Sequence, residues 1–116
     1  MKKIETLKKN YEFKNVLNKG KYLVKKQIIV YITKNKKEKN IIGIAINTKL
    51  CNAVNRNKLK RLIRENYRLL QPMLENGYNI VFLWNKKTSI DKANSKIIKN
   101  DMIEAFKDFR ILKENI

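Results

Sequence analysis

Apolar residues recur along this chain at two different spacings, and each spacing predicts a different kind of element. Short runs rich in β-branched and aromatic residues predict strands. They lie within Lys21–Thr33, at Ile41–Ile46 and at Gly77–Asn85. Segments with apolar residues three and four positions apart predict helices. They lie at Asn10–Asn18, Ala53–Leu70 and Ile97–Ile111. The predicted order is therefore αββαβα.

The boundaries of these elements carry their own signals. Gly20 follows the first helix within two residues and is a suitable stop. Asn52 is a good N-cap for the second helix, because its side chain can accept a hydrogen bond from a first-turn amide. Pro72 ends that helix. Between the first two strands, the segment 34–40 is polar throughout and predicts a solvated turn.

The strand pattern predicts how the sheet is built. The run Ile41–Ile46 is apolar on both faces, which favours a central position. We expect the first two strands to form an antiparallel hairpin. The passage from Ile46 to Gly77 holds a whole helix, long enough for a crossover between parallel strands. The prediction is one domain over residues 1–116, an α/β two-layer sandwich with a mixed sheet and its helices on one face.

The second helix carries an unusual amount of positive charge. The segment Arg56–Arg68 holds six basic residues and a single acid, Glu65. At roughly 100° per residue, one arc of the helix gathers Arg56, Asn57, Lys60, Arg61, Arg64 and Arg68. We expect the apolar arc on the other side to hold Leu59, Leu62, Ile63, Tyr67, Leu69 and Leu70. We call the first set the basic arc.

Composition strengthens the case for an anionic partner. The chain has 28 Lys and Arg against 10 Asp and Glu, a formal net charge of +18 in 116 residues. Self-repulsion at this charge disfavours a compact state. A purely solvated helix face is the alternative, but such faces usually mix signs for pairing along the helix. Nucleic acid is the favoured partner, ahead of a membrane surface.

Two further groups of residues are candidates for nucleic-acid contact. Phe13 and Tyr31 lie on elements expected to pack near each other, where they would form either a stacking surface for bases or simply core. Lys86 and Lys87 follow the last strand, where they would reach a phosphate or remain solvated.

The sequence excludes most kinds of catalytic site. It contains no histidine, and its single cysteine, Cys51, allows neither an intrachain disulfide nor a thiolate cluster. The acids are scattered, and no glycine-rich phosphate loop is present. No catalytic residue and no metal ligand is assigned. The basic N-terminus lacks the apolar run of a signal peptide, so we expect a cytoplasmic protein.

Three stretches together resemble a known family. NAVNRNKLKRLIRENYR (Asn52–Arg68) is similar to the signature of the bacterial ribonuclease P protein subunit. LKKNYEFKNVLNKGK (Leu7–Lys21) resembles that family's first helix and the glycine that ends it. GYNIVFLWNKK resembles the strand after its basic helix. The similarity spans about residues 4 to 110, in the right order.

The resemblance implies a fold and a set of contacts. The fold would be ribosomal-protein-like, with a left-handed β-α-β crossover. A catalytic RNA would be bound by Lys49 in the loop before the basic helix and, on that helix, by Arg56, Asn57, Lys58, Lys60, Arg61, Arg64 and Arg68. The single-stranded 5′ leader of precursor tRNA would occupy a cleft containing Phe13, Leu17, Tyr31 and Lys86. Mg²⁺ would be bound mainly by the RNA. Neither a membrane nor a protein oligomer is implied.

This chain departs from the family pattern at four places. Lys58 stands at the third position of the family's Arg-Asn-Arg motif, where a lysine keeps the charge but lacks arginine's bidentate fork. Cys51 replaces a glycine in the loop before the helix. Leu17 stands where an aromatic residue is common, and Asn85 stands where arginine is frequent.

Other functions fit the same residues less fully. A general RNA-binding or ribosomal-protein-like module would share the charge and the basic helix, but would have no preference for a tRNA leader. A DNA-recognition helix would not need the sheet and the aromatic residues. A stand-alone nuclease is weaker still, because the chain has no histidine and no acidic cluster.

Overall fold

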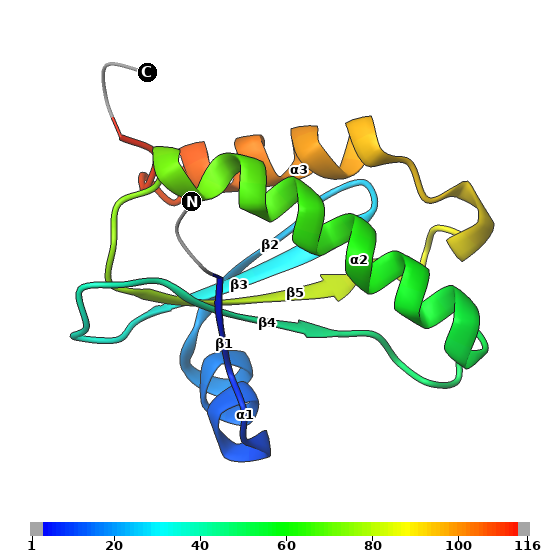
Figure 1. The fold of residues 1–116 in the computed structure, drawn as a ribbon, viewed down its shortest axis with the longest axis horizontal. Helices are drawn as coiled ribbons and strands as arrows, with labels where there is room; N and C mark the ends of the chain where they lie inside the picture. Colours follow the sequence, from blue (N-terminus) through cyan, green and yellow to red (C-terminus); the bar gives the residue numbers. More distant parts are fainter. Residues whose placement is uncertain (1–3, 114–116) are drawn as a thin grey trace.

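The computed structural model describes residues 4–113, which form a mixed sheet with helices on both sides (Figure 1). The strands are β1 (Glu5–Thr6), β2 (Lys21–Val24), β3 (Ile28–Lys34), β4 (Ile41–Ala45) and β5 (Tyr78–Trp84). The helices are α1 (Asn10–Lys19), α2 (Ala53–Leu70) and α3 (Ser95–Asp108), with short 3₁₀ turns η1 (Gln71–Met73) and η2 (Ile90–Lys92). The mixed α/β architecture is confirmed. The structure adds β1, which was not predicted, and divides the strand predicted within Lys21–Thr33 into β2 and β3.

The strand order in the sheet is β1-β4-β5-β3-β2. β4 runs parallel to both β1 and β5, whereas β3 runs antiparallel to β5 and β2. The parallel pairing across the crossover is confirmed. The predicted hairpin of β3 with β4 is wrong, because β5 lies between them and gives each long strand two neighbours. β4 is interior, as its apolar residues indicated.

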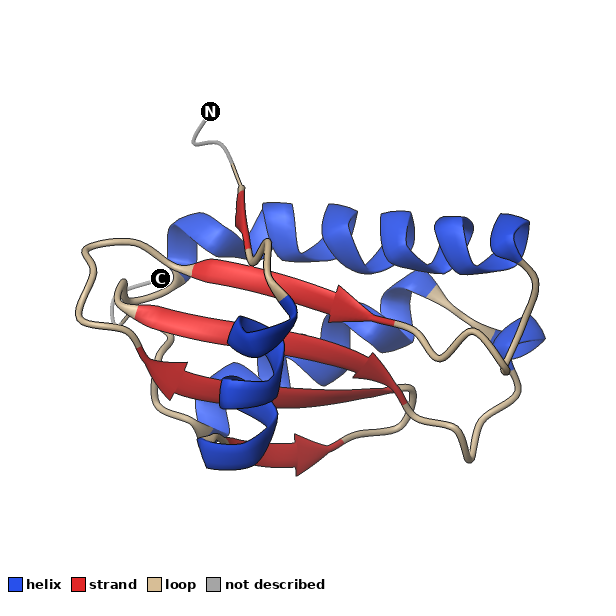
Figure 2. Cartoon of the chain, turned by 90° about the horizontal axis from the view of Figure 1, so that it is seen from below, coloured by secondary structure: helices blue, strands red, loops and turns tan. Residues whose placement is uncertain are grey.

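The crossover from β4 through α2 to β5 has the unusual hand. In Figure 2, β4 and β5 both run from left to right, α2 lies behind the sheet, and β5 lies below β4. That arrangement is left-handed, whereas most β-α-β connections are right-handed. The left-handed crossover that the resemblance implied is therefore present.

The helices do not all cover the same face, so that prediction is wrong. α2 and α3 pack on one face over a core that includes Ile63, Phe82 and Phe106. α1 lies on the opposite face over a smaller cluster of Leu7, Val16, Ile41 and Val81 (Figures 1 and 2). The physical reason is that β4 and β5 are apolar on both faces, so both faces need cover.

The stretch Lys21–Thr33 is two strands with a tight turn rather than one strand. The turn at 25–27 has no glycine or proline, and distant side chains hold it instead. Asn85 donates from Nδ2 to the Lys25 carbonyl at 2.8 Å. The Asp101 carboxylate accepts from the Gln27 amide at 2.7 Å. A turn fixed by residues 60 or more positions away leaves no local signal.

Local capping explains where the helices begin and end. Asn52 accepts from the Asn55 amide at 2.9 Å, which confirms it as the N-cap of α2. Glu12 accepts from the Lys8 and Lys9 amides at the start of α1, and these bonds hold the pKa of its carboxyl below its usual value. Gly20 ends α1 for a steric reason: a Cβ there would lie 2.4 Å from the Val16 carbonyl oxygen.

The buried face of α2 differs from the prediction at one turn. Leu59, Ile63, Tyr67 and Leu70 are buried as expected, but Leu69 is 62% exposed. The buried position that completes the stripe belongs to Asn66. Its Nδ2 donates to the Leu62 carbonyl and to Ser95 Oγ at the start of α3. A satisfied amide therefore joins the two helices where an apolar residue was expected.

Asp101 gives a direct test of how the β2–β3 turn is held. The side chain is only 2% exposed and accepts from the amides of Gln27 and Ile28 at 2.7 and 3.3 Å. Asp101→Ala should lower the free energy of unfolding in urea by about 2 kcal/mol, because buried amides lose a charged acceptor. The control, Asp108→Ala, removes a 57% exposed carboxylate that pairs with Lys25 and should cost about 0.5 kcal/mol or less. Equal losses for the two variants would contradict this role.

Candidate nucleic-acid interface

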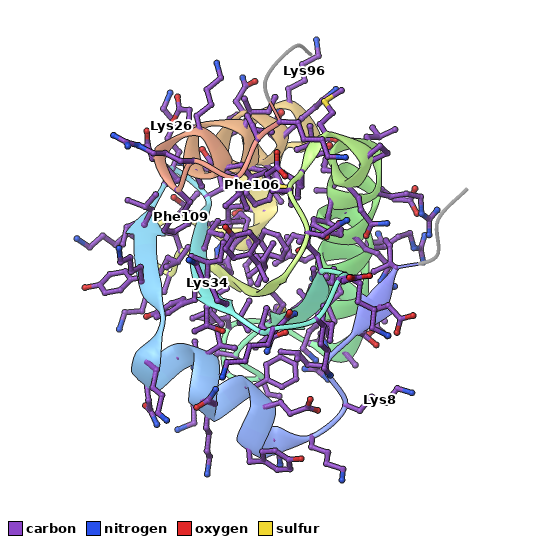
Figure 3. All side chains as sticks on the ribbon, turned by 90° about the vertical axis from the view of Figure 1, so that its left-hand side faces the viewer. Lys8, Lys26, Lys34, Lys96, Phe106 and Phe109 are labelled. Carbon is purple, nitrogen blue, oxygen red and sulfur yellow. The ribbon has the colours of Figure 1, made fainter. Side chains whose placement is uncertain are left out.

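Positive charge surrounds the whole molecule, so charge alone does not locate a binding surface. Figure 3 shows Lys8, Lys26 and Lys96 at the outside of the molecule and Lys34 in the middle of the view, each on a different segment, whereas Phe106 is buried. All four lysines are exposed. What distinguishes the basic arc of α2 is its density of arginine. Guanidinium groups bind phosphate oxygens in pairs, which an ammonium does not do.

The basic arc is available for a partner. Asn57, Arg61 and Arg64 are exposed, and Arg56 and Lys60 are half-buried. Within residues 4–113, none of the arc's cations forms an ion pair except Arg68, which lies 3.4 Å from Glu65. That pair is exposed on both sides and is worth little. The opposite side of the helix is uncharged, and burial raises the pKa of Tyr67 there, so its phenol stays neutral.

The arc continues into a hollow shared with α1. Lys60 and Arg64 line a space of about 210 Å³ together with Phe13, and its floor is the β1–β4 edge at Leu7 and Gly43. The Phe13 ring lies directly over Gly43: a Cβ there would be 2.4 Å from Phe13 Cε1. Glycine is therefore needed for this close approach. The hollow places two cations of α2 beside an aromatic residue of α1.

The sheet face that bears α1 is covered only in part. Strand pairing defines two rows across it. One row is Tyr22, Tyr31, Val81 and Gly43. The next is Val24, Ile29, Leu83 and Ala45, which we call the open row. Val81 is fully buried, whereas Val24 is 56% exposed and the other three residues of the open row are half-buried. Figure 2 shows that α1 leaves the ends of β4 and β5 uncovered on this side.

The other residues predicted for the leader cleft lie around this face. Leu17 and Tyr31 are half-buried and pack with Phe13 against the cluster under α1. They are partly core, the alternative considered for the aromatic residues, and partly accessible. Lys86 is exposed just beyond the end of β5, past Leu83 of the open row. The structure thus gathers Phe13, Leu17 and Tyr31 on one face, with Lys86 at its end.

Lys58 lies apart from the basic arc. It lines a different hollow, of about 760 Å³, with Cys51, Leu62 and Asp91 on the α3 side of the helix. Lys49 is exposed in the preceding loop, where its amide donates to Asn47 Oδ1 at 2.9 Å. Among the described residues only Lys36 and Arg110 have positive φ outside glycine, so Cys51 needs no left-handed backbone. The loop therefore tolerates the loss of the family's glycine.

Tyr22 was not identified as a candidate from the sequence, and Asn85, which departs from the family pattern, has a structural role. Asn85 is buried and braces the β2–β3 turn, so it is a structural residue here. Tyr22 is 58% exposed and stacks on Tyr31. The alternation of Tyr22 and Val24 is the sequence signal for this face, but a single strand over Lys21–Thr33 does not show it.

The side chains at this site are of kinds that bind nucleic acid. Among residues 4–113, no three His, Cys, Asp or Glu side chains lie where they would hold a metal ion together. The groups that converge are cations, an amide and half-buried aromatic or aliphatic side chains. These bind phosphates and unstacked bases. No helix of the described segment has the length and hydropathy to cross a membrane.

Known proteins are similar to this sequence over nearly its full length. A model of the ribonuclease P family matches residues 1–110. The ribonuclease P protein component of Natranaerobius thermophilus is 33% identical over 116 residues, covering 100% of this chain and 99% of that protein. The corresponding protein of Dictyoglomus turgidum is 39% identical over 113 residues, covering 97% of this chain and 94% of its own length.

Solved structures share the fold. The RNase P protein of Staphylococcus aureus superimposes with a TM-score of 0.81 at 29% identity, covering 96% of this chain and all of that one. The RNase P protein from Thermotoga maritima gives 0.77 at 27% identity, covering 86% and 93%. The family match covers nearly the whole sequence, including the basic helix α2, and the solved structures share the fold. The chain belongs to the ribonuclease P protein family.

Proposed function

We propose that this chain holds the catalytic RNA of ribonuclease P on the basic arc of α2 and the 5′ leader of precursor tRNA on the α1 side of the sheet. The hollow between α1 and α2 carries this proposal. Because Lys60, Arg64 and Phe13 line it together, a bound nucleic acid can pass from the charged helix to the apolar face without a break.

The basic arc would act mainly by neutralising phosphates. Arg61 and Arg64 lack acidic partners among the described residues, and Arg68 has only its exposed pair with Glu65, so binding RNA disrupts little existing ion pairing. Each contact releases a condensed counterion, which supplies affinity and makes it depend on salt. Lys49, in the loop before α2, and Lys58, on the α3 side of that helix, would contact neighbouring parts of the RNA.

The open row would accommodate the single-stranded leader. The half-buried apolar side chains of the open row suit bases that have left a duplex, and Lys86, just beyond the end of β5, suits a phosphate. A leader bound here would add affinity for precursor tRNA that mature tRNA lacks. A general RNA-binding module would show no such difference.

The hydrolysis itself is assigned to the RNA. Ribonuclease P chemistry implies Mg²⁺, but the residues from 4 to 113 offer no group of three ligands for a metal ion. Mg²⁺ would therefore be bound by the RNA. The chain would act in the cytoplasm, together with its RNA partner and precursor tRNA.

Reconstitution tests the proposed function as a whole. The chain is combined with its cognate RNA at low Mg²⁺, and removal of the leader from precursor tRNA is followed. Cleavage should be faster than with RNA alone, because the protein screens phosphate repulsion and grips the leader. The control is the RNA alone at high Mg²⁺, where the difference should shrink. Equal rates with and without protein at low Mg²⁺ would refute the proposal.

The salt dependence of RNA binding tests the basic arc. Arg61→Ala together with Arg64→Ala should weaken binding to the RNA subunit and reduce the slope of log K against log salt by roughly two, about 0.9 for each lost contact. The matched control is Lys96→Ala with Lys107→Ala, two exposed cations on α3. An unchanged slope for the arc variant, or an equal change for the control, would show that α2 is not the contact surface.

A further inference from the structure

Tyr22 is an exposed aromatic residue held in a fixed position. It lies directly opposite Tyr31 in the β2–β3 pairing, so both side chains are on the α1 face of the sheet. The two rings stack, with centroids 5.1 Å apart and planes inclined by 23°. Tyr31 is half-buried against the cluster under α1, whereas Tyr22 is 58% exposed. One ring therefore anchors the pair and the other is presented to solvent.

This arrangement suits recognition of a base. A tyrosine side chain has few rotatable bonds, and stacking on Tyr31 restricts them before any ligand arrives. Binding then costs little further ordering. Aromatic rings bind unstacked bases irrespective of sequence, because every base has a flat face. Tyr22 carries the exposed ring in this row.

The place of Tyr22 in the sheet sets which part of a bound strand it would meet. The row that contains Tyr22 begins at Gly43 in the hollow, but Val81 in its middle is buried under α1, so a bound strand would follow the open row over β4, β5, β3 and β2. The open row ends at Val24, and Tyr22 lies two residues away on the same face of β2, next to that end.

We propose that Tyr22 is a leader-binding residue that stacks a base of the 5′ leader beyond the nucleotides held by the open row. This inference rests on the proposed function, because it takes the leader to lie on the α1 side of the sheet. It adds a contact at the β2 edge, farthest from the basic arc. Purines have the larger stacking surface, so a purine at that leader position binds more tightly than a pyrimidine.

A leader-length series in the reconstituted holoenzyme tests this contact. Affinity is measured for precursor tRNAs whose leaders are shortened one nucleotide at a time, and for mature tRNA. Tyr22→Ala should bind the full leader about five- to tenfold more weakly. Its affinity should also stop rising at a leader one nucleotide shorter than for the unmodified chain. Mature tRNA should bind both equally.

Two variants separate stacking from other roles of Tyr22. Tyr22→Phe keeps the ring and should match the unmodified chain. Tyr11→Ala removes a tyrosine of similar exposure, 66%, that lies over the outward side of α1 beside Lys9, and should have no effect. A 2-aminopurine placed at the outermost contacted leader position should be quenched by the unmodified chain and by Tyr22→Phe, but not by Tyr22→Ala.

The outcomes distinguish this inference from the proposed function. If the unmodified holoenzyme binds precursor and mature tRNA equally, the proposed leader site fails, and this inference fails with it. If leader preference is present but Tyr22→Ala retains the full length dependence, only the inference fails. A Tyr22→Ala loss that is equal for all leader lengths and for mature tRNA would show a general effect on folding or assembly rather than a leader contact, which also overturns it.

Discussion

The central strands are apolar on both faces, and the rest of the structure depends on how those faces are covered. Val81 and Ile41 face α1, whereas Phe82 and Ile42 face α2 and α3. Two long helices, α2 and α3, pack over one face. The other face receives only the ten residues of α1. The uncovered remainder is the open row, an apolar surface that solvent would not favour on its own. The same shortage of cover therefore creates the proposed leader site.

The basic arc follows from a second constraint on the same helix. α2 must bury Leu59, Ile63 and Tyr67 against the sheet, which fixes its rotation about its own axis. That rotation turns Lys60 and Arg64 toward the β4 edge and α1, and it sends Lys58 to the opposite flank. Lys58, which departs from the family motif, therefore lies outside the hollow between α1 and α2, so this departure leaves the lining of that hollow unchanged. The departures at Cys51 and Asn85 also have local structural accounts.

The sequence predicted elements whose signals are local. α2 is bounded as expected because Asn52 caps it and Pro72 follows it, and β4 and β5 are marked by β-branched residues. Pairing was harder to predict, since nothing in β3 or β4 shows that β5 lies between them. The β2–β3 turn depends on Asn85 and Asp101, far along the chain. Tyr22 was missed for that reason, although Phe13, Leu17 and Tyr31 were placed correctly on one face.

Site-directed crosslinking within the holoenzyme tests most directly the claim that α2 binds the catalytic RNA while the opposite face of the sheet binds the leader. In a Cys51→Ser background, a photoreactive group is attached through Val24→Cys on the open row, Asn57→Cys on the basic arc or Lys96→Cys on α3. We expect the position 24 probe to crosslink the leader, the position 57 probe to crosslink the RNA subunit, and the position 96 probe to crosslink neither efficiently. Leader crosslinks from position 57 or 96 with none from position 24 would contradict the account.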